Sequence, residues 1–192
     1  FAFGNLAETA RTYATQLQRL RDTRYEQITD TNRSIDDGVY VAVSDPRQPT
    51  LAPTRRDAPP QFNFAPLLNA VDSLSHAASR YDRAFTSGTV SASAAASLAG
   101  RSAAIKSINM RLLQAERSMT SNDGLKGRSW YRHMLYAPGF YTGYGVKTMP
   151  GAREAIEQGS WTDVNAEILR IASALNREAA LVSKLAGDFG TP

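Results

Sequence analysis

Apolar residues recur in alternating steps of four and three along four separate segments of this chain of 192 residues. Such spacing places an apolar stripe on one face of an α-helix, because a helix turns once every ~3.6 residues. The pattern therefore predicts four long amphipathic helices. Their stripes are Leu6-Ala10-Tyr13-Leu17-Leu20, Leu67-Val71-Leu74-Ala78-Tyr81-Phe85, Leu98-Ile105-Ile108-Leu112-Ala115-Met119 and Val164-Ile168-Ile171-Leu175-Ala179-Val182-Leu185.

Capping and helix-breaking residues set the expected helix bounds. Asn5 and Asn63 are suited to cap the first two helices, and Ser160 with Asp163 resembles a capping box before the last one. The expected helices cover residues 5–34, 63–88, 92–119, 160–187 and, as a short extra element, 150–159. Helices joined in this order bury their stripes most simply as an all-α four-helix bundle, which makes residues 1–192 a single domain.

Two segments interrupt the helical pattern. Residues 36–61 contain prolines at 46, 49, 53, 59 and 60, which exclude a regular helix and predict an irregular insertion. Within it, Val39 to Val43 alternates weakly and suggests a short strand. Residues 121–149 combine glycines with a high density of aromatic residues and predict a loop segment.

The composition narrows the classes of function. The net charge is +4, but 18 of the 22 basic residues are arginines scattered among acids, which favours solvated helix faces over nucleic-acid binding. No cysteine is present, and the apolar runs are too short to span a membrane, so we expect no membrane contact. The chain begins at Phe1, which suggests a fragment or a processed product.

Few residues of this chain match a known pattern of catalytic groups or metal ligands. The two histidines, His76 and His133, lie 57 positions apart and match no metal-binding motif. No nucleophile elbow, phosphate loop or dinucleotide fingerprint occurs. We therefore expect no catalytic residues, no metal and no cofactor within this chain.

The aromatic segment has two interpretations. Trp130, Tyr131, Tyr136 and Tyr144 are dense enough to form a binding surface. They are also suited to pin a non-helical segment onto the bundle, with Arg132 hydrogen-bonded to backbone carbonyl groups. Residue types alone favour the second interpretation.

The same segment carries a resemblance to a known family. Tyr131-Arg132-His133, Tyr136-Ala137-Pro138, Tyr144 and Pro150-Gly151 before an amphipathic helix resemble the transferrin-receptor-like dimerisation domain of glutamate carboxypeptidase II-like proteins. The resemblance implies a homodimer, attached in the same polypeptide to a peptidase domain that holds zinc. It also implies an extracytoplasmic location, while the alanine- and arginine-rich composition suggests a bacterial protein.

The resemblance further implies that the aromatic segment reaches the substrate pocket of the peptidase domain. The family's Lys-Tyr pair for a C-terminal glutamate falls on Gly143 and Tyr144, and Lys147 is the nearest cation that could replace the missing lysine. The candidate substrate-binding residues are therefore Tyr144 and Lys147. The alternative is a receptor-like relative that has lost peptidase activity.

An assembly role needs an apolar face beyond the core stripe. The last helix has a broader apolar arc through Ala172, Ala174, Ala180 and Leu181. This arc fits a dimer interface, but a central helix in a monomer would have the same composition.

Overall fold

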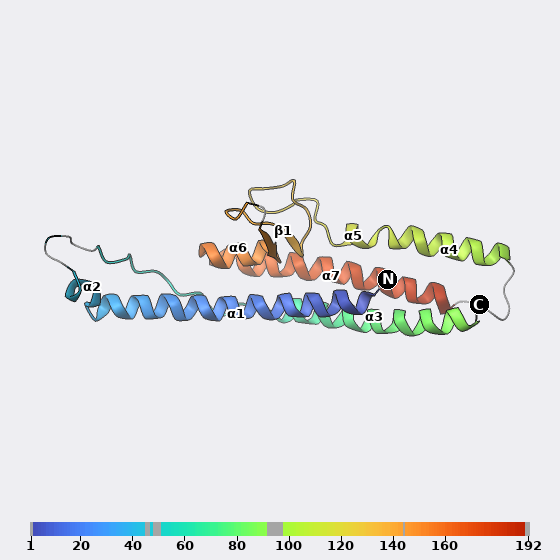
Figure 1. Ribbon diagram of the computed structural model, residues 1–192, viewed down its shortest axis with the longest axis horizontal. Coiled ribbons are helices and arrows are strands. Elements are labelled where there is room, and N and C mark those ends of the chain that lie inside the picture. Colours follow the sequence, from blue (N-terminus) through green and yellow to red (C-terminus); the bar gives the residue numbers. More distant parts are fainter. Residues whose placement is uncertain (1, 45–46, 48–50, 92–97, 144, 191–192) are drawn as a thin grey trace.

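A computed structural model describes residues 2–44, 47, 51–91, 98–143 and 145–190. The part of the chain that it describes is mostly helical, with one small sheet (Figure 1). The elements are α1 (Phe3–Asp36), α2 (Val39–Ala42), α3 (Ala65–Ser91), α4 (Leu98–Leu112), α5 (Ala115–Ser118), β1 (Tyr136–Pro138), β2 (Val146–Thr148), α6 (Pro150–Gln158) and α7 (Trp161–Gly190). The mostly helical fold class is thus confirmed.

The centre of the fold is a pair of long helices, α3 and α7, which pack along each other. The helix α1 covers α3, whereas α4, α5 and α6 pack against α7 (Figure 1). The predicted stripes supply the core, since Leu17, Leu74, Ile168, Ile171 and Leu175 are fully buried. This arrangement differs from a simple bundle of four equivalent helices, because α4 lies along the outside of α7.

Several helix bounds differ from the prediction. The helix α3 continues through Gly88 to Ser91, and α7 continues through Gly187 to Gly190. The predicted alanine-rich start of the third helix, residues 92–96, lies outside the described residues. Asn63 does cap α3, because its side-chain oxygen accepts a hydrogen bond from the Ala65 N–H at 3.1 Å.

The C-terminal part of α1, from residue 24 onward, and the proline-rich segment that follows it form a long projection, called the arm (residues 24–61). The arm extends beyond the other helices at one end of the molecule (Figure 1). The end of the arm that leads back to the core is held against α1, because the Arg21 guanidinium donates hydrogen bonds to the carbonyl groups of Pro59 and Pro60. Farther out, Asn32 and Arg56 exchange two hydrogen bonds, at 2.8 and 3.2 Å.

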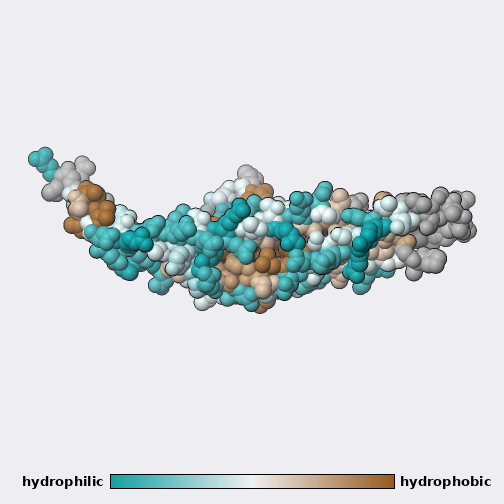
Figure 2. All heavy atoms as spheres, turned by 90° about the horizontal axis from the view of Figure 1, so that it is seen from below, coloured by the Kyte–Doolittle hydropathy of each residue, from teal (hydrophilic) through white to brown (hydrophobic). Residues whose placement is uncertain are grey.

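The strand suggested at Val39 to Val43 is wrong. Gly38 has a φ of 69°, and its carbonyl accepts hydrogen bonds from Val41 and Ala42, which begins the short helix α2. The local hydrogen bonds decided the structure, because a weak alternation over five residues needs a neighbouring strand to form a sheet. The exposed valines of α2 gather at the tip of the arm (Figure 2).

Candidate functional site

The aromatic segment folds into a hairpin (residues 136–148) that lies over α6. Its strands β1 and β2 are antiparallel and pair Tyr136 with Thr148 and Pro138 with Val146. The hairpin leads into α6 through Met149, whose N–H donates to the Leu135 carbonyl at 2.7 Å. Met149 is fully buried with a φ of 46°, a conformation uncommon outside glycine, so packing fixes the end of the hairpin.

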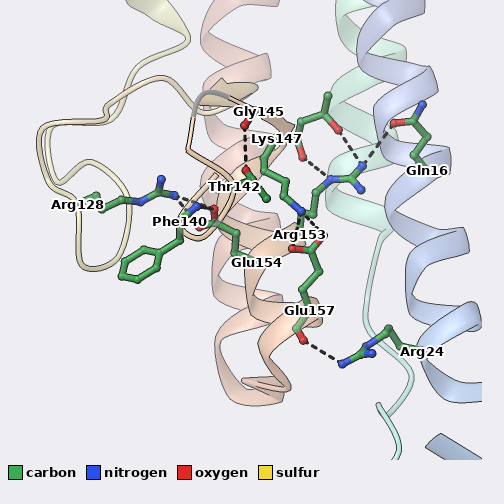
Figure 3. Close-up of polar contacts among 11 residues, drawn as sticks. Gln16, Arg24, Arg128, Phe140, Thr142, Gly145, Lys147, Arg153, Glu154 and Glu157 are labelled. Carbon is green, nitrogen blue, oxygen red and sulfur yellow. Dashed lines mark hydrogen bonds and ion pairs between the residues drawn. The ribbon is translucent and has the colours of Figure 1, made fainter. Parts of the chain in front are cut away.

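A buried ion pair holds the first strand of the hairpin (Figure 3). Arg128 Nη2 donates to both carboxylate oxygens of Glu154 on α6, at 2.8 and 2.7 Å. The side chains are 7% and 12% exposed, respectively. Arg128 Nη1 also donates to the Pro138 carbonyl, and Glu154 Oε1 accepts from the Phe140 N–H at 2.8 Å. Both residues of the pair therefore bind the backbone where β1 ends.

A second ion pair holds the other strand. Lys147 Nζ on β2 donates to the two carboxylate oxygens of Glu157 on α6, at 2.8 and 2.9 Å. The predicted cation thus lies at the base of the hairpin and is already bound to an acid of the same domain. Figure 3 shows the Lys147 side chain directed toward α6.

Hydrogen bonds also connect α6 and the hairpin to α1. Arg153 donates to the carbonyl and hydroxyl oxygens of Thr148 and to the side chain of Gln16. Arg24 donates to the Glu157 carbonyl at 3.0 Å (Figure 3). The position of the hairpin is therefore set jointly by α6 and α1.

A third group of contacts fixes the start of β1 to α5. The Tyr136 hydroxyl donates to the Glu116 carboxylate, and His133 Nε2 lies 3.3 Å from the same group. The hydrogen bond to Glu116 raises the pKa of Tyr136 to about 12, with smaller contributions from burial and from the carboxylate charge. Desolvation lowers the pKa of His133, against a smaller upward effect of Glu116.

Sequence reasoning and structure agree only partly at this site. Lys147 lies on β2 of a hairpin, where the sequence predicted only a loop segment, and Tyr144 lies outside the described residues. Arg132 is exposed, whereas carbonyl groups in and beside the aromatic segment accept hydrogen bonds from Arg128, Arg153, Arg170 and Arg177. Arg128 and Glu154 were missed, because 26 positions separate them and no local pattern links them.

The described residues contain no group of three or more His, Cys, Asp and Glu side chains placed to hold a metal ion. None of the helices in that part of the chain is long and apolar enough to cross a membrane.

A family model matches the part of the chain that contains this site. The family model of the transferrin receptor-like dimerisation domain matches residues 62–183, which include the hairpin, α6 and most of α7. The chain belongs to this family. The arm (residues 24–61) precedes the matched region.

Curated relatives share parts of the dimerisation domain. A probable glutamate carboxypeptidase, LAMP1, of Arabidopsis thaliana is 40% identical over 87 residues, which cover 42% of this chain and 13% of that protein. A probable glutamate carboxypeptidase of Arthroderma benhamiae is 42% identical over 67 residues, covering 35% and 9%. A protein of Schizosaccharomyces pombe named as an inactive zinc metalloprotease is 32% identical over 73 residues, covering 38% and 9%.

The dimerisation domain thus matches only about a tenth of the length of these relatives. These relatives are plant and fungal proteins, so the bacterial origin suggested by composition stays a prediction.

Proposed function

We propose that this chain is the non-catalytic homodimerisation domain of a glutamate carboxypeptidase-like zinc exopeptidase. The zinc ligands and the catalytic residues belong, in this proposal, to a peptidase domain of the same polypeptide. The family match and the names of the relatives support it, and so does the small share of those relatives that the domain covers.

The observation that carries the dimer proposal is the exposed apolar surface of α4 and the turn that follows it. Ile108 and Leu112 face α7 and are partly buried against the core. On another side of the helix, Met110 is 58% exposed and Leu113 is 70% exposed. A helix with apolar residues on two sides needs two neighbours, and in the described part of the protomer α4 packs against α7. We assign the second neighbour to a second copy of the domain.

The apolar arc predicted on the last helix contributes less to this surface than expected. Ala172 and Ala174 are buried inside the protomer. Ala180 is exposed and Leu181 is partly exposed, so these two remain open to a second copy. We therefore place the centre of the interface on the free side of α4.

The hairpin is proposed as the part that the domain lends to the substrate pocket. It lies outside the packed helices (Figure 1), and two ion pairs fix its strands to α6. Lys147 lies on its second strand, and Tyr144, the other residue of this proposal, lies outside the described residues. A loop held in this way is suited to enter a neighbouring domain without losing much entropy on binding.

Sedimentation equilibrium at micromolar concentration tests the homodimer. The 20.9 kDa chain should sediment at twice its mass. The double variant Met110→Glu/Leu113→Glu should sediment as a folded monomer, because two carboxylates would lose their hydration at the interface. The matched control is Leu51→Glu, at an apolar residue that is 91% exposed on the arm. A folded monomer of the unmodified chain would refute the proposal.

The second candidate is a receptor-like relative whose peptidase domain has lost its activity. The relative named as an inactive zinc metalloprotease favours it. Assaying the full-length parent protein against a panel of dipeptides, with and without added zinc, separates the two. Hydrolysis supports the exopeptidase, whereas a zinc-free, inactive dimer supports the receptor-like relative.

A further inference from the structure

A polar groove lies between α3 and α7, the two helices that pack along each other (Figure 1). Its volume is about 780 Å³, within the range of ~300–1,000 Å³ that is typical of small-molecule sites. All of its lining residues belong to these two helices, so the described part of the chain forms the whole groove. The polar side chains that line it include Ser73, His76, Arg80, Arg83, Asn176 and Ser183.

The charged side chains of the groove all carry positive charge. None of the described residues that line it is Asp or Glu, whereas Arg80 and Arg83 contribute two guanidinium groups. His76, Arg80 and Arg83 follow one another at steps of four and three, the spacing that places side chains on one face of a helix. Like charges at this spacing repel each other. An anion bound between them would relieve that repulsion.

The acids of the same two helices are engaged elsewhere. On α3, Asp72 pairs with Arg11 of α1 at 2.7 Å, and Asp82 lies beside Gly4 of α1. The acids of α7 contact side chains outside the groove, in the pairs Lys126–Asp163, Arg170–Glu167, Ser118–Glu178 and Arg111–Asp188. In the described structure these acids therefore do not pair with Arg80 or Arg83.

The two arginines differ in how they are held. Arg80 Nη2 donates to the Ser183 hydroxyl at 2.8 Å, and that hydroxyl donates to the Ala179 carbonyl at 2.7 Å. This contact fixes the Arg80 guanidinium against α7 and leaves its other N–H groups available. The side chains of His76 and Arg83 form no hydrogen bond or ion pair in the described part of the chain. One cation is thus positioned in advance, and a second can move onto a ligand.

We infer that the groove between α3 and α7 binds a phosphate group, carried by a small organic phosphate or by a lipid headgroup. Arg80 and Arg83 supply the positive charge, and His76 and Asn176 supply further N–H donors from the two walls. The inference does not depend on the proposed function, because no described residue of α4 or of the hairpin lines the groove.

A phosphate suits these donors better than a carboxylate. A guanidinium group donates two parallel hydrogen bonds to the oxygen atoms of either anion. A phosphate monoester offers a third acceptor oxygen and carries ~1.5–2 negative charges at pH 7, which matches two guanidinium groups and additional N–H donors. A carboxylate carries a single negative charge and would leave one of the two arginines unpaired.

The two histidines of the chain make the site directly observable by NMR. His76 lines the groove, whereas His133 lies beside Glu116 of α5. Methyl phosphate titrated into the 192-residue chain at constant pH should shift the imidazole signals of His76 to saturation and leave those of His133 in place. Acetate should bind about tenfold more weakly, because it can pair with one guanidinium only. Shifts of equal size at both histidines would overturn the inference.

Removal of one guanidinium group should weaken binding. Arg83→Gln should lower the affinity for methyl phosphate by about tenfold, and Arg83→Lys should be intermediate because it keeps the charge and loses the paired donors. The matched control is Arg19→Gln, which removes the charge of an exposed arginine on α1 and should leave the affinity nearly unchanged. Circular dichroism checks that each variant is folded. An equal loss in Arg19→Gln and Arg83→Gln would show a response to net charge alone and would overturn the inference.

A vesicle experiment separates the two sources of the phosphate. Cosedimentation with vesicles of equimolar phosphatidylcholine and phosphatidic acid, lost in Arg83→Gln, would identify a lipid headgroup. Binding of methyl phosphate without cosedimentation would identify a soluble ligand. Binding of neither probe overturns the inference. Met110→Glu/Leu113→Glu should bind like the unmodified chain, so the result stands whether or not the domain dimerises through α4.

Discussion

At the scale of single residues, Glu178 is the least expected side chain of the core. It lies on α7 with no exposed surface, and one carboxylate oxygen accepts a hydrogen bond from the Ser118 hydroxyl. Its other oxygen has no hydrogen-bond partner in the described structure. Burial raises the pKa of Glu178, although the Ser118 hydrogen bond acts in the opposite direction.

Glu178 should make the free energy of unfolding depend on pH. Its contribution is fully present below the ordinary glutamate pKa of 4.5 and is lost as pH rises through the raised folded value. Glu178→Gln should therefore raise stability at neutral pH and remove this slope. Urea unfolding of both proteins between pH 4 and 8 measures the effect. An unchanged slope in the variant would contradict it.

His133 should act with the opposite sign. Its Nδ1 accepts the N–H groups of Leu135 and Tyr136 at 3.3 and 3.4 Å, which requires the neutral ring. Because desolvation lowers its pKa, its contribution is present above the ordinary value of 6.5 and is lost as pH falls through the lower folded value. An NMR titration of the imidazole should give a pKa below 6.5. A value at or above 6.5 would be inconsistent with this account.

The pair of Arg128 and Glu154 should show strong energetic coupling. Arg128→Met leaves a buried carboxylate without its cation, which typically costs ~3–5 kcal/mol. Adding Glu154→Gln removes that charge and keeps an acceptor for the Phe140 N–H, so part of the loss should be recovered. Urea unfolding of the two single variants and the double variant gives the coupling. Additive losses would indicate that the pair acts as two independent side chains.

At the scale of elements, the arm and the helical core have different roles. Residues that pack against the core lie in the first part of α1, and Phe62 marks where the chain re-enters the core. The family match begins at the same residue. The outer part of the arm (residues 26–57) is held mainly by hydrogen bonds and ion pairs between α1 and the segment that follows it, such as the hydrogen bonds between Asn32 and Arg56.

Removing the outer arm should therefore leave the core folded. Replacing residues 26–57 with a short Gly/Ser linker is geometrically reasonable, because Arg21 already contacts Pro59 and Pro60. Buried Ile28 is lost with the arm, so a decrease of about 1.5–3 kcal/mol in unfolding free energy is expected. Circular dichroism and urea unfolding measure it. Loss of cooperative unfolding would show that the arm is part of the folding unit.

At the scale of the whole molecule, α7 connects the features on which function depends. It packs against α3 in the core, carries α5 and α6 along its length, and supports α4 on its outer side. The proposed dimer surface on α4 and the hairpin over α6 are therefore attached to one rigid helix. Dimerisation would then fix the orientation of two hairpins without any contact between them.

Coupling of folding to dimerisation should make thermal stability depend on concentration. Binding of a second copy to the folded state alone raises the unfolding midpoint as the protein concentration increases. A hundredfold increase should raise the midpoint of the unmodified chain, whereas Met110→Glu/Leu113→Glu should show no such dependence. Differential scanning calorimetry provides the measurement. An unchanged midpoint for the unmodified chain would argue against an obligate dimer.

Helical periodicity was enough to locate the long helices and to show which of their faces are buried. The four-and-three spacing alone identifies the stripes of α1, α3 and α7, because helical periodicity is a local property. The motif residues of the aromatic segment likewise identified the family, which the match over 62–183 confirms. The sequence also suggested a strand at Val39 to Val43, where local hydrogen bonds of Gly38 produce α2 instead.

The contacts that hold the hairpin, and the identity of the helix with an exposed apolar side, depend on tertiary packing. Arg128 and Glu154 meet only after the segment between them has folded back onto α6, and Lys147 is neutralised by an acid ten positions away. Ala172 and Ala174 look like interface residues in the sequence, yet both are buried in the hydrophobic core of the protomer. The physical reason is that periodicity shows that a face is apolar, whereas packing determines which neighbour covers it.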